Sequence, residues 1–166
     1  RRRAAAAGSG TAGGVEVRLL GGAMEGEARE VAEAQAALAL EIAAQRLDHP
    51  VLLLSGGECT VTRRGDGVGG PNAEFVLAAV VALKGHPKIH LIACDTDGVD
   101  GAAEVAGAIG DPSTLALSEA MGGSAAAALR NNDAHGFFCA IGSQVVTGPT
   151  MTNVHAVCSL LGSPDW

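Results

Sequence analysis

The sequence predicts an α/β fold, a layered α/β/α arrangement around a mixed sheet. Val51–Leu54 is a continuous apolar run, typical of a strand that is buried on both faces, and Ile89–Cys94 is predicted to be the next buried strand. The segments between and after them carry apolar residues at helical spacing, so strands and helices alternate along the chain. Apolar residues make up 48% of the 166 residues and aromatic residues only 2%, so Ala, Val, Leu and Ile must form most of the core.

The first part of the chain predicts one strand and one long helix. Residues 1–14 are rich in Arg, Ala and Gly, and we expect a frayed helix end or a flexible segment there. Val15–Leu20 alternates as a strand does and should end at Gly21-Gly22. Glu25–Leu47 is predicted to be a helix. Its buried face is predicted from the helical spacing of Val31, Gln35, Leu38 and Ile42.

The middle of the chain predicts two strands, a glycine loop and a second helix. The strand at Val51–Leu54 should end in a turn at Ser55–Glu58, and Thr60–Arg63 alternates like a further strand. Gly65–Gly70 is typical of a loop. Asn72–Lys84 is apolar nearly all round, so this helix should pack on more than one side.

The last part of the chain predicts short helices and two strands. After the strand at Ile89–Cys94, helices are expected at 112–121, 124–131 and 134–141, and strands at 144–146 and 154–160. We expect residues 15–50 to be a lead-in from a preceding domain, residues 51–161 to form a C-terminal domain, and residues 162–166 to be a tail.

Charge and cysteine usage narrow the function classes. The formal net charge is −7 and no segment forms a basic face, which argues against nucleic acid and anionic membrane surfaces as partners. No apolar run approaches the roughly 20 residues that cross a bilayer. The four cysteines are widely spaced without a CxxC pair, which favours free thiols in a cytoplasmic protein over disulfides or a zinc site.

Three polar, glycine-containing loops follow apolar runs, and each offers chemistry at the end of a strand. Ser55–Glu58 has backbone N–H groups that an anion could approach closely, although a plain hairpin turn fits equally well. Asp95–Gly101 holds three carboxylates, which suit Mg²⁺ or sugar-like hydroxyls; the alternative is a solvated Asp-Gly turn. Thr147–Asn153 supplies hydroxyls and an amide, or forms a simple Ser/Thr turn.

Two further motifs have competing interpretations. Gly65–Gly70 matches G-x-G-x-x-G, a dinucleotide fingerprint when it follows a buried strand and opens a helix. The preceding Thr62–Arg64 is polar, which weakens that interpretation. Asn131–Asp133 is best explained as a helix end joined to the N-cap of the next helix.

Taken in order, these motifs resemble one family. The runs SGGECTV, G-x-G-x-GG-x-N-x-EF, DTDGVDG, NNDAHGFF and TGPTMTNV are similar to the C-terminal part of the class II glycerate kinases, also called MOFRL-type glycerate 2-kinases. Some members of that family carry the name hydroxypyruvate reductase. The resemblance covers about residues 15–161, and five motifs in the same order make it specific.

The resemblance implies transfer of the ATP γ-phosphate to the 2-hydroxyl of D-glycerate, with Mg²⁺. It also implies a larger N-terminal Rossmann-like domain and an active site in the cleft between the two domains. This chain lacks that domain, so we expect it to be inactive alone. A homodimer is left open.

Phosphoryl transfer depends mostly on positioning and charge neutralisation, so the motif-bearing loops should form one wall of the cleft. We expect Glu58, Asp97 and Asp100 to be catalytic, with the two aspartates as metal ligands. The expected substrate-binding or phosphate-binding residues are Ser55, Gly56, Gly57, Thr60, Gly67, Gly69, Gly70, Asn72, Glu74, Thr147, Gly148, Thr150, Thr152 and Asn153.

One departure bears on this expectation. Many relatives have arginine where this chain has Pro71. Either Arg63 or Arg64 replaces it, or activity is weakened, or the charge is handled differently. Two other functions therefore stay open: an NAD(P)H-dependent hydroxypyruvate reductase, and a non-catalytic small-molecule binding module.

Overall fold

A seven-stranded mixed sheet organises the chain. The structure, a computed structural model, describes residues 8–45, 47–101, 103–150 and 157–162. The strands are β1 (Gly8–Ala12), β2 (Val15–Glu27), β3 (Val51–Thr60), β4 (Ile89–Cys94), β5 (Gly107–Gly110), β6 (Gln144–Val145) and β7 (Val157–Gly162). Their order is β1-β2-β3-β7-β4-β5-β6. β2 and β3 are parallel, whereas β7 lies between β3 and β4 and is antiparallel to both.

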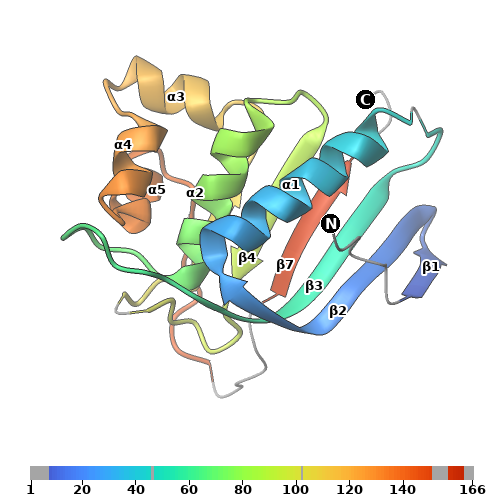
Figure 1. Cartoon of the computed structure of the whole chain (residues 1–166), viewed down its shortest axis with the longest axis horizontal. Helices are drawn as coiled ribbons and strands as arrows, with labels where there is room; N and C mark the ends of the chain where they lie inside the picture. Colours follow the sequence, from blue (N-terminus) through green and yellow to red (C-terminus); the bar gives the residue numbers. More distant parts are fainter. Residues whose placement is uncertain (1–7, 46, 102, 151–156, 163–166) are drawn as a thin grey trace.

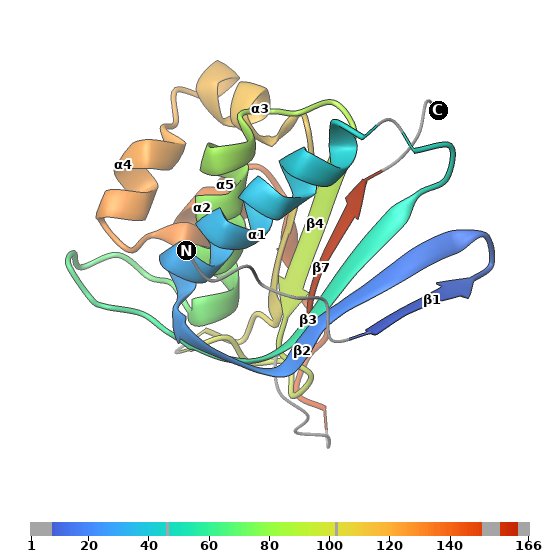
Figure 2. The same ribbon diagram turned by 45° about the vertical axis from the view of Figure 1, so that its right-hand side comes forward.

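The helices form a layer on one face of this sheet. Figures 1 and 2 show α1 (Ala28–Ala43) and α2 (Pro71–Leu83) lying across that face. The shorter α3 (Thr114–Ala120), α4 (Ala125–Arg130) and α5 (Ala134–Ala140) are grouped beside α2. The mixed α/β class is confirmed, although the second helical layer of an α/β/α arrangement is not among the described residues. In the same part of the chain, no helix has the length and apolarity needed to cross a membrane.

The centre of the core is α2, which explains its unusual sequence. Phe75, Val76, Leu77 and Ala79 are at most 1% exposed, because the helix packs against α1, β4, β5 and the α3–α5 group at once. The expectation that it packs on more than one side is confirmed. On α1, the facing residues are mostly alanines, and their small side chains let the two helices approach closely.

The largest difference from the sequence-based expectation concerns β2 and β3. β2 continues through Gly21-Gly22 to Glu27, so the helix begins at Ala28 instead of Glu25. β3 continues to Thr60, so the turn expected at Ser55–Glu58 and the separate strand expected at Thr60–Arg63 are both wrong. The two strands pair in register from Met24/Gly57 to Glu27/Thr60 after two irregularities.

Gly57 makes that extension possible. Its φ of 146° is one that L side chains rarely adopt, and a Cβ there would lie 2.2 Å from the carbonyl oxygen of Met24. Because two backbones approach this closely, only glycine fits. A glycine that resembles a turn residue in the sequence is therefore part of a bulged strand.

Other differences are smaller. The segment expected to be flexible at residues 1–14 contains β1, while residues 1–7 lie outside the described part. β5 was not expected, because Gly107–Gly110 has no alternation of polar and apolar residues. The strand expected at 154–160 begins outside the described residues, and β7 covers 157–162. The helices near 114, 125 and 134 agree with expectation within two residues. Cys59, Cys94 and Cys139 are free thiols.

We expect Gly57→Ala to lower the free energy of unfolding by about 3 kcal/mol, through backbone strain and the clash with Met24. Urea denaturation followed by circular dichroism measures this. Gly22→Ala is the matched control, because a Cβ at Gly22 would meet nothing within 4 Å. Equal stability of the two variants would contradict the bulge as described.

Candidate functional site

A cavity of about 310 Å³ opens where β3, α2 and the loop after β4 meet. Its walls include the β3 segment Ser55–Cys59, the start of α2 at Pro71 and Asn72, and the side chains of Asp95 and Asp97. The structure therefore brings together six of the residues expected to form the site. They are Ser55, Gly56, Gly57, Glu58, Asn72 and Asp97.

The loop after β4 holds its carboxylates through its own backbone. Oδ1 of Asp97 accepts a hydrogen bond from the N–H of Val99 at 2.8 Å, and Oδ1 of Asp95 accepts one from the N–H of Asp97 at 3.4 Å. These contacts leave the second oxygen of each carboxylate free of hydrogen bonds within the described residues. The loop can therefore present two hard oxygen donors to the cavity.

The segment at Thr147–Thr150 supports this loop from outside the cavity. The N–H of Thr150 donates to the carbonyl oxygen of Asp97 at 2.9 Å, and its hydroxyl donates to the carbonyl oxygen of Thr96. A Cβ at Gly98 would lie 2.2 Å from the carbonyl oxygen of Gly148. Thr147, Gly148 and Thr150 thus do not line the cavity. Thr152 and Asn153 lie outside the described residues.

Asp100 lies at the N-terminus of α2 and does not share the cavity with Asp97. Its carboxylate accepts hydrogen bonds from the N–H groups of Asn72 at 2.9 Å and Ala73 at 2.8 Å, and the side chain is 0% exposed. A helix N-terminus attracts an anion, and here an internal carboxylate fills that position. The described residues include no group of three or more His, Cys, Asp or Glu side chains that could hold a metal.

His135 packs against Asp100. Its Nε2 lies 3.1 Å from the carbonyl oxygen of Asp100 and 3.4 Å from its carboxylate. Burial alone lowers the pKa of His135, but the hydrogen bonds to Asp100 and the nearby charges of Asp100 and Asp133 outweigh burial and raise the pKa above its usual value. His135 therefore favours the charged form more than a free imidazole does.

The glycine loop is held by the segment Asn131–Asp133, and this removes the basis for a dinucleotide site. Five consecutive backbone N–H groups, those of residues 64–68, donate to oxygens of Asn131, Asn132 and Asp133. A Cβ at Gly65 or Gly67 would lie 2.4–2.7 Å from atoms of Asn131 or Asp133. These N–H groups are therefore not available to bind a pyrophosphate.

The remaining glycines of this loop also serve close packing. A Cβ at Gly69 would lie 2.9 Å from the carbonyl oxygen of Asn132, and one at Gly70 would lie 2.4 Å from Cγ of Asp100. Gly67, Gly69 and Gly70 do not line the cavity, and neither does Thr60, whose hydroxyl donates to the carbonyl oxygen of Gly26 at 3.2 Å.

Asn132 is the centre of this network and connects it to Glu74. Its Oδ1 accepts from the N–H groups of Arg64 and Gly65, while Nδ2 donates to both carboxylate oxygens of Glu74 at 3.2 and 3.0 Å. Glu74 is 0% exposed and also accepts from Nε of Arg29 at 2.6 Å. The buried Glu74 therefore joins α1, α2 and the α4–α5 connection and does not reach the cavity.

Gln35 is a residue at this site that sequence reasoning did not assign to it. Its side chain is buried under β3, where Nε2 donates to Oγ of Ser55 at 3.0 Å and to the sulfur of Met24 at 3.1 Å. Both partners line the cavity. A polar side chain on the buried face of a helix needs a hydrogen-bond partner. The position of Gln35 on the predicted buried face was therefore the feature of the sequence that could have indicated this role.

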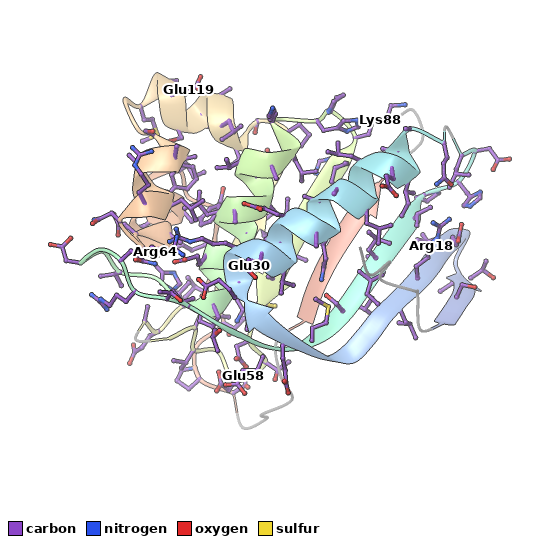
Figure 3. The ribbon with its side chains drawn as sticks, viewed as in Figure 1. Arg18, Glu30, Glu58, Arg64, Lys88 and Glu119 are labelled. Atoms are coloured by element: carbon purple, nitrogen blue, oxygen red, sulfur yellow. The ribbon has the colours of Figure 1, made fainter. Side chains whose placement is uncertain are left out.

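The cavity is acidic. Glu58, Asp95 and Asp97 line it, and its described wall contains no lysine or arginine. Arg63 donates to carbonyl oxygens of the glycine loop instead, and Figure 3 shows Arg64 on that loop, well away from Glu58. Burial and, next, the charge of Glu27 raise the pKa of Cys59, so its thiol is a poor nucleophile. An anionic ligand in this cavity requires a cation that offsets the repulsion by these carboxylates.

The chain is similar to several known proteins. The model of the MOFRL family matches residues 51–156. A D-glycerate 2-kinase of Thermotoga maritima is 36% identical over 144 residues, which are 86% of this chain and 34% of that protein. A protein of Agrobacterium vitis named "Putative hydroxypyruvate reductase" is 44% identical over 147 residues, 86% of this chain and 34% of that protein.

The fold comparison gives the same result. The crystal structure of a glycerate kinase from Thermotoga maritima superposes with a TM-score of 0.84 and 34% identity, covering 88% of this chain and 36% of that one. The chain thus spans about a third of the length of the relatives it matches.

We expect Asn132→Asp to destabilise the fold by about 3 kcal/mol, because it removes the donor to Glu74 and places a second buried carboxylate beside it. Asn131→Ala is the matched control, since it removes one exposed hydrogen bond of 3.4 Å. Thermal unfolding of both variants tests this. Similar losses in the two would show that Asn132 is not the centre of the network.

We expect His135 to make stability depend on pH. Because its folded pKa is raised, its contribution is complete below the unfolded pKa of about 6.5 and is lost as pH rises through the folded pKa. The difference in unfolding free energy between the unmodified chain and His135→Gln should therefore shrink from pH 5.5 to pH 8.5. Urea titrations at intervals of one pH unit measure it, and a difference that grows with pH would contradict the assignment.

Proposed function

Because this chain belongs to the MOFRL family, we propose that it forms one wall of the active site of a cytoplasmic glycerate 2-kinase, which transfers the γ-phosphate of ATP to the 2-hydroxyl of D-glycerate. The observation that carries this proposal is the cavity at the end of β3, which Glu58, Asp95 and Asp97 line together with the start of α2. Relatives named glycerate kinase or D-glycerate 2-kinase support it.

The donor set of the cavity suits the Mg²⁺ that accompanies ATP. Mg²⁺ is commonly held by one or two carboxylates together with water and substrate phosphates. In this chain we assign that position to Asp95 and Asp97, whose loop leaves one oxygen of each carboxylate free. When bound there, Mg²⁺ would neutralise charge on the transferred phosphoryl group.

Glu58 and Asn72 are the groups we assign to the glycerate. Glu58 is exposed at the cavity edge and can accept a hydrogen bond from a substrate hydroxyl. Asn72 is 3% exposed, and its Nδ2 donates to Asp100 at 3.2 Å, which fixes the orientation of the amide. Its carbonyl oxygen then remains as an acceptor without a hydrogen bond in the described part of the chain.

The acidic lining of the cavity also indicates that basic groups from another domain are needed to bind the anionic substrates. Glycerate and ATP are both anions, and three carboxylates without a basic side chain repel them. We propose that basic groups come from an N-terminal Rossmann-like domain that faces this wall, as the greater length of the relatives allows. The 166-residue chain alone should then have no kinase activity.

Reduction of hydroxypyruvate with NAD(P)H is not supported. It needs the glycine loop as a pyrophosphate site, and the N–H groups of residues 64–68 already donate to Asn131–Asp133. The glycine loop of this chain therefore gives no support to the reductase activity that the name of the Agrobacterium vitis relatives suggests.

A chimera tests the proposal. The matched region of the Thermotoga maritima D-glycerate 2-kinase is replaced by this chain, and ADP release is followed with D-glycerate as acceptor. We expect turnover, and we expect Asp97→Asn and Glu58→Gln each to lower kcat at least about 100-fold through lost positioning and charge compensation. Asp66→Asn is the matched control, because Asp66 is exposed on the glycine loop outside the cavity.

A folded chimera without turnover, or one in which both cavity variants keep full activity, would overturn the proposal. Turnover by the 166-residue chain alone would overturn the need for a complementary part.

A further inference from the structure

A second, apolar groove adjoins the site cavity. It has a volume of about 280 Å³ and lies between the first half of α1 and the outer half of β2. Leu20, Ala34 and Leu38 form its apolar wall, and it shares Met24 and Val31 with the site cavity. The two hollows are therefore neighbours across a methionine, the most adaptable of the apolar side chains.

The polar groups of the groove lie at its rim. Glu27 is already engaged, because its carboxylate accepts from the N–H and the hydroxyl of Thr62. Glu25 and Glu30 have exposed side chains and make no hydrogen bond or ion pair within the described residues. Figure 3 shows Glu30 at the start of α1, and Glu30 lines the groove. The rim therefore offers two free acceptors above an apolar wall.

The chemistry of the two proposed substrates decides which one this groove can take. Glycerate is a small, fully hydrophilic acid and gains nothing from an apolar wall. A nucleotide has a planar, largely apolar base and a ribose whose hydroxyls donate hydrogen bonds to carboxylates. Of these two substrates, only the nucleotide has an apolar base for the wall of the groove and hydroxyl donors for the carboxylates at its rim.

We infer that this groove holds the nucleoside end of the phosphoryl donor, with its phosphates directed past Met24 toward the Asp95–Asp97 loop. This inference rests on the proposed function. The free carboxylates of Glu25 and Glu30 repel a triphosphate, so they favour the orientation in which the base and ribose occupy the groove. The sulfur of Met24 can contact the edge of the base.

Gln35 connects the two hollows. Its buried amide donates both to the sulfur of Met24 and to the hydroxyl of Ser55, which lies in the site cavity. The same side chain thus fixes the boundary between the groove and the cavity.

Nuclear magnetic resonance of the ¹⁵N-labelled 166-residue chain tests the inference. The probes are adenosine, ADP with Mg²⁺, and D-glycerate with Mg²⁺. We expect adenosine and ADP to shift the amide signals of Leu20 and of residues 24–38 in a saturable way below about 10 mM, the weak affinity of a half-site. D-glycerate should leave unchanged the signals of Leu20, Ala34 and Leu38, which line the groove and not the site cavity.

Two tryptophan variants on α1 sharpen the experiment. Ala34→Trp fills the groove from an exposed position, and Ala37→Trp is the matched control, because Ala37 is also exposed but does not line the groove. We expect Ala34→Trp to weaken adenosine binding at least about tenfold, and Ala37→Trp to change it less than about twofold; a tenfold change corresponds to 1.4 kcal/mol.

The absence of saturable shifts, shifts confined to other residues, or equal effects of the two variants would overturn the inference. The outcome is distinguishable from that of the proposed function. A chimera that phosphorylates glycerate with an unchanged KM for ATP in the Ala34→Trp form would leave the function standing and remove the groove. Adenosine binding in the groove without turnover by the chimera would support the groove as a nucleoside site and overturn the proposed function.

Discussion

The carboxylate of Asp100 at the N-terminus of α2 is the interaction on which the rest of the site depends. α2 is the most buried helix, and its own N-cap residue is Gly70, which has no side chain to offer. Asp100 supplies the missing acceptor from 27 and 28 residues away in the sequence, to Ala73 and Asn72. This contact fixes Pro71 and Asn72, which line the cavity, against the loop that carries Asp95 and Asp97.

A second constraint lies next to the first. Gly70 lies against Asp100, Gly65, Gly67 and Gly69 lie against Asn131–Asp133, and only glycines permit these close approaches. Oxygens of Asn131–Asp133 accept hydrogen bonds from the backbone N–H groups of the loop. Asn132 also donates to Glu74, which in turn accepts from Arg29. The glycine loop and the segment Asn131–Asp133 therefore bind each other, and neither of them lines the cavity.

The sequence predicted those parts of the fold that have a clear period. The positions of the strand at Ile89–Cys94 and of the helix that became α2 agree with expectation, because such apolar segments have few alternatives. The expected burial of the strands on both faces is wrong, since residues along β3 and β4 alternate between buried and more exposed and the helices cover one face. The continuation of β3 through Gly56-Gly57 was not predictable, since it depends on the approach of β2, which the local sequence does not encode. Of the carboxylates predicted for the site, Glu58 and Asp97 line the cavity, and their catalytic role stays a prediction. A sequence does not reveal whether a carboxylate faces a ligand or another group of the protein. Asp100 accepts from backbone N–H groups of α2, and Glu74 accepts from the side chains of Arg29 and Asn132.

The position of β7 has a consequence for how the molecule assembles. Among the described strands β7 is the last in the chain, yet it lies between β3 and β4. During synthesis, β1, β2 and β3 can form one half-sheet and β4, β5 and β6 another, but the sheet becomes continuous only after β7 has emerged from the ribosome. Until then β3 and β4 each present an open strand edge, the kind of surface that invites aggregation and chaperone binding. Insertion of β7 between β3 and β4 is therefore a late, long-range step in folding. Until that step, the nascent chain should depend on protection of the open edges of β3 and β4.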